Sequence, residues 1–194
     1  MRAGLRVAGL LSQGIRLGQQ TGFDSGSTLD YVYRNQPAGR LGLGRWMDAR
    51  YLDSMGWRGI RVRKQHVEEL LQIAMQDLAR AGTPLRLLDI AAGHGRYVLD
   101  AVAASAVPVD SILLRDYSEI NVRDGRQLIA ERGLQDKARF VQADAFDRAS
   151  LAAVSPRATL AIVSGLYELF PDNAPVRTSL AGVADALELD GYLV

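Results

Sequence analysis

The strongest constraint on the fold is a regular alternation of short apolar runs with helix-periodic segments, which begins near Trp57. The apolar runs have strand length and span residues 85–92, 111–115, 138–142, 159–164 and 191–194. Segments with apolar residues at helical spacing cover residues 62–81, 96–106, 118–132 and 172–187. Strands that alternate with helices form a parallel sheet with helices on both faces. We therefore expect an α/β fold whose ligands bind beyond the carboxyl ends of the strands.

The first 56 residues lack this alternation and are rich in glycine and arginine. Turn-forming residues gather at 22–27 and 35–40. Polar residues such as Arg6 interrupt the first apolar stretch, which therefore predicts an amphipathic helix rather than a signal peptide. The apolar side of that helix would consist of Leu5, Leu10, Leu11, Ile15 and Leu17. We expect two parts, an N-terminal helical region at 1–56 and the α/β domain at 57–194.

Composition excludes several kinds of chemistry. The chain has no cysteine, so disulfides, thiolate metal sites and cysteine nucleophiles are excluded, and a reducing cytoplasm is the expected location. With His66 and His94 as the two histidines, no metal site is expected. No run of about 18 apolar residues is present, so no transmembrane segment is predicted.

Charge is unevenly distributed along the chain. Residues 1–64 hold 11 arginines and lysines against 4 acidic residues, whereas residues 65–194 hold 12 against 18. A basic N-terminal third indicates an anionic partner. A substrate, a lipid surface, nucleic acid and the acidic remainder of the chain itself all satisfy that requirement.

A glycine-containing turn follows the first predicted strand, between Asp89 and Gly95. Such a turn lets a ligand approach bare backbone and directs the N–H groups of the next helix at it. A dinucleotide fingerprint would need glycine at positions 91, 93 and 96, where the chain has Ala91, Gly93 and Arg96. The turn also lacks the Gly-Lys-Ser/Thr of a P-loop. A nicotinamide oxidoreductase is therefore a weaker alternative.

Polar and aromatic residues follow the second and fourth strands as well. Asp116 can accept hydrogen bonds from both hydroxyls of a ribose, and Tyr117 beside it could cover an adenine face. A solvated loop aspartate is the simpler alternative. After the fourth strand, Gly165 permits close approach of a ligand to the backbone. Tyr167 and Glu168 are candidate substrate contacts, and Glu168 could act as a base if its pKa is raised. Tyr167 could instead serve only in packing.

The turn at 89–95 resembles motif I of class I S-adenosylmethionine (SAM)-dependent methyltransferases, acidic-x-Gly-x-Gly-x-Gly, with Ala91 in place of the first glycine. Residues 22–37 and 56–64, with the stretches DIAAGHGRY, RDYSEINV, QADAFD and SGLYELFPDN, resemble a bacterial group of methyltransferases assigned by fold. Members of that group also occur fused behind an α/β-hydrolase domain of lysophospholipase type. The resemblance spans nearly the whole chain and implies a Rossmann-like three-layer sandwich that binds SAM.

The resemblance also implies roles for individual residues. Asp89 would anchor the glycine turn or the methionine amine, and Asp144, with Asp147 as a neighbouring alternative, would accept from the adenine amino group. The remaining cofactor contacts would come from Ala91, Gly93, Gly95, Ala145, Phe146, Ser164 and Gly165.

In this fold the segment before the first strand often covers the cofactor as a lid. An arginine there could pair with the SAM carboxylate, and a tyrosine could face the sulfonium. The candidates are Tyr31, Tyr33, Arg34, Asn35, Arg61 and Arg63. His94 is a weak candidate for a catalytic base, and we assign none.

The expected function is methyl transfer to an oxygen, nitrogen or carbon of an unidentified acceptor, a small molecule or a lipid. A non-catalytic SAM-binding module is the alternative. Residues 164–172 lack the Asn/Asp-Pro-Pro-Tyr/Phe motif of many DNA methyltransferases, which disfavours a nucleic-acid acceptor. A complete fold of this class has seven strands, so we expect a chain truncated in its fifth strand, with an exposed sheet edge where two copies could pair.

Overall fold

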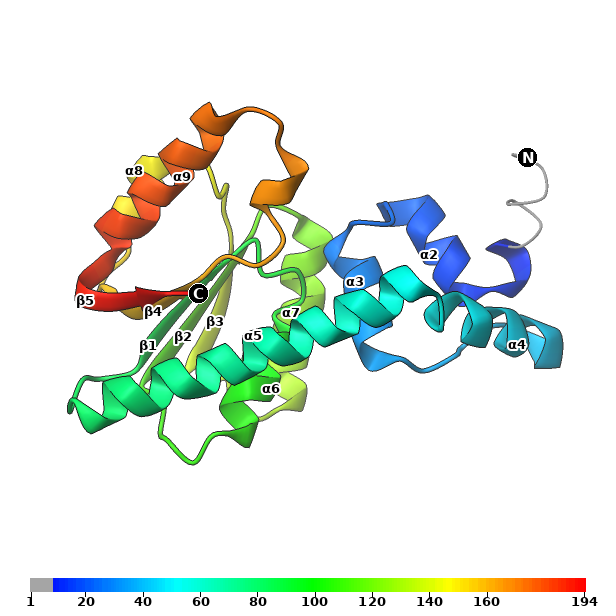
Figure 1. Cartoon of the computed structure of the whole chain (residues 1–194), viewed down its shortest axis with the longest axis horizontal. Coiled ribbons are helices and arrows are strands. Elements are labelled where there is room, and N and C mark those ends of the chain that lie inside the picture. Colours follow the sequence, from blue (N-terminus) through cyan, green and yellow to red (C-terminus); the bar gives the residue numbers. More distant parts are fainter. Residues whose placement is uncertain (1–8) are drawn as a thin grey trace. The chain divides into compact units, whose positions relative to one another are not determined.

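The computed structural model describes residues 9–194, and their contacts divide the chain between His66 and Val67 into two compact units. Each unit is described by itself (Figure 1). Of the predicted N-terminal apolar positions, Leu5 lies outside the described residues.

The N-terminal unit is helical, as predicted. It contains α2 (Gln13–Thr21), α3 (Gly26–Arg34), α4 (Leu41–Leu52) and the first part of α5 (Met55–Arg80). The side chains of Ser12 and Ser25 cap α2 and α3. The turn predicted at 22–27 is shorter than expected, because the cap at Ser25 allows α3 to begin at Gly26. Likewise, α5 begins seven residues before the predicted position 62.

A buried carboxylate organises this unit. Asp48 of α4 is fully buried and accepts hydrogen bonds from the Ser12 hydroxyl, the Gly14 amide at 3.0 Å, the Tyr31 hydroxyl at 2.5 Å and the Ala38 amide at 3.1 Å. Burial alone would raise the pKa of Asp48, but these donors outweigh it and lower the pKa below its ordinary value. All four lone-pair positions of the carboxylate are therefore used in joining α2, α3 and α4.

The C-terminal unit contains a five-stranded sheet in the order β3-β2-β1-β4-β5, and every neighbouring pair is parallel. This confirms the predicted fold class. The strands are β1 (Arg86–Ile90), β2 (Ser111–Asp116), β3 (Ala138–Gln142), β4 (Ala158–Ile162) and β5 (Leu187–Leu193).

Helices cover both faces of the sheet, which gives the predicted three layers. They are α6 (Arg96–Ala104), α7 (Glu119–Glu131), α8 (Arg148–Ala152) and α9 (Asn173–Ala186), with a short 3-10 helix, η1 (Tyr167–Leu169). Figure 1 shows α6 and α7 on one face and α8 and α9 on the other. The helix starts predicted at Ser118 and Asp172 are confirmed, because both side chains accept a hydrogen bond from the first turn of their helix.

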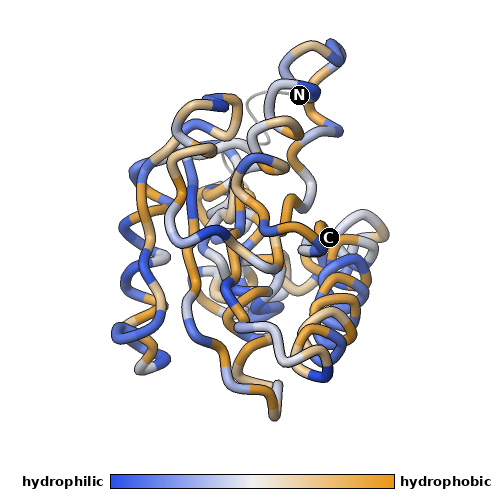
Figure 2. The backbone as a smooth tube through the Cα atoms, turned by 90° about the vertical axis from the view of Figure 1, so that its left-hand side faces the viewer, coloured by the Kyte–Doolittle hydropathy of each residue, from blue (hydrophilic) through white to orange (hydrophobic). Residues whose placement is uncertain are grey.

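The core lies in the central strands. All five residues of β4 and the last four of β1 are buried, because a parallel strand inside the sheet has helices on both sides. In Figure 2 the helices carry both apolar and polar residues within each turn, as expected of helices with one buried face. Every carboxyl end of these parallel strands consequently points to the same rim of the sheet.

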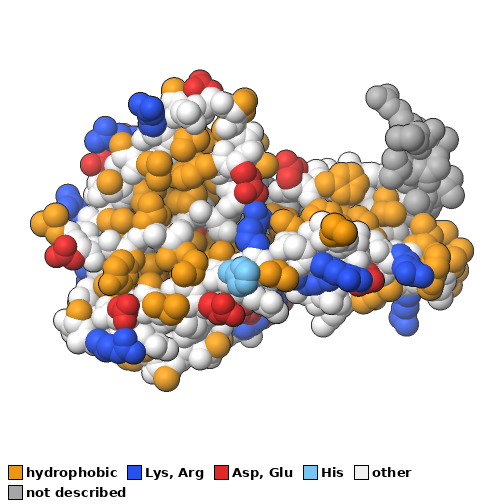
Figure 3. Space-filling view, in the orientation of Figure 1, with side chains coloured by type: hydrophobic (Ala, Val, Ile, Leu, Met, Phe, Trp, Pro, Cys, Tyr) orange, Lys and Arg blue, Asp and Glu red, His pale blue; other side chains and the backbone are white. Residues whose placement is uncertain are grey.

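The last strand leaves an exposed edge. β5 starts at Leu187, four residues before the predicted run, and pairs with β4. Within residues 9–194 no strand pairs with its other side. Leu189 is 92% exposed, and Tyr192 and Leu193 are also exposed. Figure 3 shows a broad group of apolar side chains between α9 and β5.

None of the helices in the described part of the chain combines the length and apolarity needed to cross a bilayer.

Candidate functional site

Hydrogen bonds join the loops at the carboxyl ends of the first three strands. The Ala92 amide donates to the Arg115 carbonyl at 3.0 Å, and the Gly93 amide donates to Asp116 Oδ2 at 2.9 Å. From the other side, the Ala143 amide donates to the Asp116 carbonyl at 3.0 Å. The structure therefore brings the predicted glycine turn, Asp116 and the loop after β3 together at one rim.

The Asp116 carboxylate is the centre of these contacts. It is 7% exposed, and besides Gly93 it accepts from the Ser118 amide at 2.8 Å and from Asn121 Nδ2 at 3.0 Å. A carboxylate offers about four lone-pair positions, so the protein already uses three of them. One position remains for a strong hydrogen bond from a ligand. Recognition of both ribose hydroxyls would require them to share it or to displace one of these donors.

The glycine turn has an unusual backbone. Ala91, Gly93 and Gly95 all have positive φ angles, of 57°, 58° and 74°. A Cβ atom on Gly95 would lie 2.4 Å from Leu114 Cδ1, so β2 leaves no room for a side chain there. Helix α6 starts directly after Gly95 without a side-chain cap. The turn thus presents bare backbone next to the N–H groups of a helix, which suits an anionic or polar ligand.

Asp89 lies at the end of β1 with no exposed surface. The Tyr97 hydroxyl donates to its Oδ1 at 2.7 Å, whereas Oδ2 has no hydrogen-bond partner among the described residues. Burial, reinforced by the nearby charge of Asp116, raises the pKa of Asp89 well above its ordinary value. An unsatisfied acceptor below the turn fits a cofactor that carries a donor group. A ligand would reach it only after a shift of Tyr97 or of the turn.

The predicted residues of the loop after β3 differ in exposure and in their contacts. Asp144 is exposed, and its Oδ1 accepts from the Phe146 amide at 2.9 Å. Asp147 instead caps α8 by accepting from the Ser150 amide at 3.0 Å. Ala145 is buried, and the Phe146 ring meets the Phe170 ring edge-on at a centroid distance of 4.6 Å.

Phe146 therefore connects the loops after β3 and β4. Tyr117 is 77% exposed and offers an uncovered aromatic face near this rim. Its carbonyl accepts from the Gln142 side chain at 3.0 Å, which fixes the backbone beside Asp116.

The loop after β4 contains Ser164 and Gly165, both half-buried, and Gly165 has a φ of 77°. The Tyr167 hydroxyl lies 3.0 Å from Ser179 Oγ on α9, and burial raises the pKa of Tyr167. This contact favours a packing role for Tyr167. Glu168 is exposed.

The two histidines lie in different surroundings. The His94 side chain is 11% exposed, and its Nε2 lies 3.8 Å from Asp124 Oδ2 on α7. This contact directs the ring of His94 toward α7. His66 is exposed on α5. Residues 9–194 contain no group of three histidine, aspartate or glutamate side chains suited to hold a metal ion.

Two of the lid candidates, Arg34 and Arg61, have partners within the N-terminal unit. Arg34 pairs with Asp30 at 3.1 Å, with its guanidinium over the Tyr31 ring. Arg61 donates to the Leu52 carbonyl at 2.8 Å. Both arginines therefore already stabilise this unit.

Sequence reasoning did not identify two residues that hold the site together. Asn121 reaches back from the first turn of α7 to Asp116, and Tyr97 reaches from α6 to Asp89. The signal for Tyr97 was an aromatic hydroxyl on the apolar face of a helix, since a buried tyrosine usually finds a hydrogen-bond partner. Asn121 follows the cap Ser118 by three residues, a spacing that places it beside the strand end.

The strained Ala91 gives a first prediction. A left-handed conformation costs a residue with a Cβ about 1–2 kcal/mol. Glycine opposes part of this gain, because the greater conformational entropy of its unfolded chain lowers stability by about 0.4–1 kcal/mol. Ala91→Gly should therefore raise the free energy of unfolding by about 0.5–1 kcal/mol in urea titrations. Ala92→Gly is the matched control and should lower it, because Ala92 does not share the positive φ. An Ala91→Gly protein less stable than the parent would contradict this explanation.

The buried carboxylate gives a second prediction. Because the native pKa of Asp89 is raised, the folded state binds more protons than the unfolded state above about pH 4, and stability falls as pH rises toward the native pKa. Asp89→Asn should remove this loss and be more stable than the parent at pH 7, and the gain should vanish near pH 4. Melting temperatures between pH 4 and 8 would measure it.

Asp185 is the control, because its pKa is shifted in the opposite direction from that of Asp89. The hydrogen bond from Arg148 lowers the pKa of Asp185, so its contribution is present at neutral pH and lost on acidification. Asp185→Asn should therefore be slightly destabilised at pH 7. A destabilised Asp89→Asn protein at pH 7 would show that the charge on Asp89 is favourable in the fold.

Comparison with known proteins agrees with this architecture. Residues 1–194 match a family described as "Putative methyltransferase". The Escherichia coli (strain K12) protein YnbC is 56% identical over 194 residues, which are 100% of this chain and 33% of YnbC. The chain thus spans about a third of the length of this relative.

Two solved structures share the fold at low sequence identity. A "possible exported protein" from Bordetella parapertussis is 19% identical with a TM-score of 0.66, covering 87% of this chain and 52% of that one. An O-methyltransferase family protein from Burkholderia thailandensis is 18% identical with a TM-score of 0.55, covering 75% and 42%. The chain belongs to the family matched over its whole length, and it has the class I methyltransferase fold.

Proposed function

We propose that this chain binds SAM at the carboxyl ends of β1 to β4 and transfers its methyl group to a small-molecule or lipid acceptor. The observation that supports this most is the Asp116 carboxylate, hydrogen-bonded to the Gly93 amide of the glycine turn. This contact holds a carboxylate that can accept from ribose hydroxyls beside bare backbone, and the chain belongs to a methyltransferase family. Family membership supports methyl transfer, and the site geometry supports an adenosyl cofactor.

Different residues at the rim would contact different parts of the cofactor. The backbone at Ala91, Gly93 and Gly95 would cradle it, with Asp89 below. Asp116 would accept from the ribose. The adenine would lie at the loop after β3 and contact Asp144, Ala145, Phe146 and Tyr117.

Bound SAM would supply a methyl group on a sulfonium that leaves as a neutral thioether, S-adenosylhomocysteine, as the bond to the acceptor forms. The protein's own residues mainly have to align the acceptor and exclude water. Ser164 and Gly165 would lie near the reacting atoms, where the positive φ of Gly165 keeps backbone accessible. Glu168 would contact the acceptor together with the ring of Tyr167, whose hydroxyl is already bonded to Ser179, and we assign no catalytic base, His94 included.

Several further assignments belong to this proposal. Tyr33, Arg34, Arg61 and Arg63 are proposed as lid or substrate residues. Cytoplasmic location and an α/β-hydrolase fusion or operon partner are also proposed, the first from the absence of cysteine. A non-catalytic SAM-binding module is the alternative, which would bind the same cofactor without transfer.

Calorimetric titration tests the cofactor. SAM and S-adenosylhomocysteine should bind, whereas NAD⁺ should not bind measurably, because Ala91 and Arg96 replace two fingerprint glycines. Asp144→Ala should weaken both adenosyl ligands about tenfold, the effect of losing one charge-assisted hydrogen bond. Asp147→Ala is the matched control, since each aspartate accepts from one backbone amide in the same loop. NAD⁺ binding, or equal losses in both variants, would contradict the adenine assignment.

A transfer assay separates the enzyme from the non-catalytic module. Incubation with methyl-labelled SAM and fractionated cell extract should label an acceptor in the small-molecule or lipid fraction, and Asp144→Ala should label less at limiting SAM. Label in nucleic acid would contradict the proposed acceptor class. SAM binding without any labelling would favour the alternative.

We also propose that two copies pair through the free edge of β5. An exposed strand edge bearing Leu189 and Tyr192 is a template for another strand, and lysine on such an edge opposes pairing. Light scattering should show a dimer whose population rises with concentration, and Leu189→Lys should shift it to monomer. Leu41→Lys, at an 81% exposed leucine of α4, should not. A folded parent protein that stays monomeric at all concentrations would refute the pairing.

A further inference from the structure

One helix of the N-terminal unit has an unusual distribution of polarity. The side of α4 that faces the unit consists of Gly44, Asp48 and Leu52, which are buried and spaced four residues apart. At about 100° per residue, the opposite side consists of residues such as Leu43 and Trp46, which are 60% and 59% exposed. A surface helix normally buries its apolar side chains and exposes its polar ones. In α4 the aspartate is buried and the tryptophan lies in solvent.

The contacts of the buried side fix this orientation of α4. A Cβ atom on Gly44 would lie 2.4 Å from the Leu11 carbonyl oxygen, so the helix lies against backbone and leaves no room for a side chain there. The four donors to Asp48 come from α2, α3 and the segments beside them. A rotation of α4 that buried Trp46 would break these bonds and leave their donors unpaired. The exposure of Leu43 and Trp46 is therefore a property of the fold rather than of one side-chain rotamer.

Further apolar side chains are exposed at the two ends of α4. They belong to Leu41, its first residue, and to Met55, the first residue of α5. Figure 3 shows apolar side chains over α4 with arginine or lysine side chains beside them. Exposed apolar side chains that gather in one place mark a surface for another protein or for a membrane.

The cations of α4 are also exposed. Arg50 lies on the same side of the helix as Trp46, and its guanidinium is 5.8 Å from the centre of the Trp46 ring. Arg40 and Arg45 are exposed at the amino end. Within residues 9–194 the side chains of Arg40 and Arg45 make no hydrogen bond or ion pair. Three arginines are thus available next to the exposed apolar side chains.

Acidic side chains do not neutralise this surface. Asp48, the acidic residue of α4, is fully buried. Asp53 is exposed at the carboxyl end of α4, but Arg58 donates to both of its carboxylate oxygens, at 2.9 and 2.8 Å. Residues 9–66 hold nine arginines and lysines against four aspartates and no glutamate. The N-terminal unit is therefore positively charged around an apolar surface.

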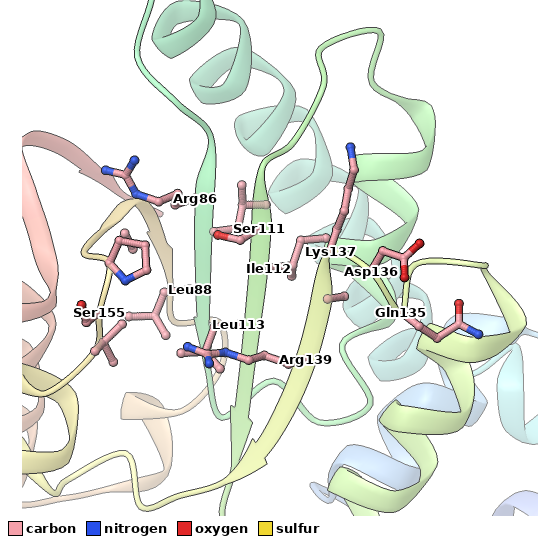
Figure 4. A pocket seen from close by; sticks show the side chains of 15 residues that line it. Arg86, Leu88, Ser111, Ile112, Leu113, Gln135, Asp136, Lys137, Arg139 and Ser155 are labelled. Carbon is pink, nitrogen blue, oxygen red and sulfur yellow. The ribbon is translucent and has the colours of Figure 1, made fainter.

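The hollow at the amino ends of the strands in the C-terminal unit offers no comparable surface. Its lining includes Leu88 and Leu113, which are buried members of the core. Figure 4 shows the Lys137 side chain directed away from Arg139. That hollow consequently provides neither an open apolar floor nor two cations that converge, whereas α4 provides exposed apolar and cationic side chains together.

A lipid bilayer with anionic head groups matches both features of α4. Tryptophan prefers the boundary between lipid chains and head groups, because its ring is apolar and its N–H is polar. Leucine side chains can enter the chain region, while arginines extend their apolar stems along it and reach the phosphates with their charge. Nucleic acid would match the arginines but would leave Leu41 and Leu43 in water.

We propose that α4 docks the N-terminal unit on an anionic membrane surface. The helix would lie in the plane of the interface, with Leu43 and Trp46 among the lipid chains. Its three arginines, Arg40, Arg45 and Arg50, would pair with lipid phosphates. This docking is independent of the proposed function, since none of these residues belongs to the candidate SAM site.

Sedimentation with vesicles tests the docking. The 194-residue chain should bind vesicles of phosphatidylcholine and phosphatidylglycerol at least about tenfold more tightly than vesicles of phosphatidylcholine alone, because each arginine near an anionic surface contributes about fivefold. Added salt should weaken the binding by screening these charges. Trp46→Ser should weaken it about tenfold, and Arg45→Gln about fivefold.

Two variants in the C-terminal unit are the matched controls. Ile73→Ser removes a 57% exposed apolar side chain of α5, and Arg177→Gln removes an exposed arginine of α9. Both should bind the anionic vesicles as the parent does, because neither residue belongs to α4.

The two tryptophans of the chain locate the surface that enters the bilayer. A phospholipid with brominated chains quenches the fluorescence of an indole that lies among the chains. Such vesicles should quench the parent and Trp57→Phe, in which Trp46 remains. They should not quench Trp46→Phe, because Trp57 is half-buried and packs against the Tyr51 ring at a centroid distance of 5.6 Å.

Several outcomes would overturn the proposal. They are no binding of the parent to vesicles, equal binding to neutral and anionic vesicles, unchanged binding of Trp46→Ser, and quenching of Trp57 alone. Tighter binding to a DNA or RNA oligonucleotide than to vesicles would identify nucleic acid as the partner instead. Self-association without lipid that Trp46→Ser abolishes would identify a second copy of the chain as the occupant of this surface.

Discussion

The carboxylate of Asp116 is the interaction on which the arrangement of the candidate site depends. It accepts from the glycine turn after β1, from the first turn of α7 and from the Asn121 side chain, while its own carbonyl accepts from the loop after β3. Without these bonds, the glycine turn would keep the bond from the Ala92 amide to the Arg115 carbonyl, but its contact with the loop after β2 would be lost. Burial is the main reason that the pKa of Asp89 is raised, and the charge of Asp116 adds to this effect, so Asp116 influences both the shape and the electrostatics of the rim.

The carboxyl ends of the parallel strands lie at one rim of the sheet, and this chain gathers three aspartates there. The carboxyl rim has Asp89, Asp116 and Asp144, which suits a cofactor with hydroxyl, amino and sulfonium groups.

Sequence periodicity predicted the sheet well because its three central strands, β2, β1 and β4, are buried on both faces and therefore largely apolar. The run 138–142 coincides with β3, and the caps Ser118 and Asp172 begin their helices as predicted. α8 could not be found this way, since five residues do not complete two helical turns and show no periodicity. β5 was predicted to start late because Glu188 and Asp190 break the apolar pattern at an exposed edge.

The site was predictable as a set of strand ends, but not in its internal contacts. Which carboxylate faces a ligand and which serves the fold depends on tertiary hydrogen bonds, as Asp144 and Asp147 show within a single loop. The same holds for Tyr167, whose hydroxyl forms a hydrogen bond with Ser179 on α9. Ala91 shows the opposite case, because its place in the motif indicated a glycine position and its φ of 57° gives the physical reason.

A crystal structure of the chain with S-adenosylhomocysteine is the most direct test of the central claim. The account predicts a ribose hydroxyl within hydrogen-bonding distance of Asp116, backbone contacts from residues 91–95, and adenine against Asp144 and Phe146. A ligand bound elsewhere, or a ribose away from Asp116, would contradict it.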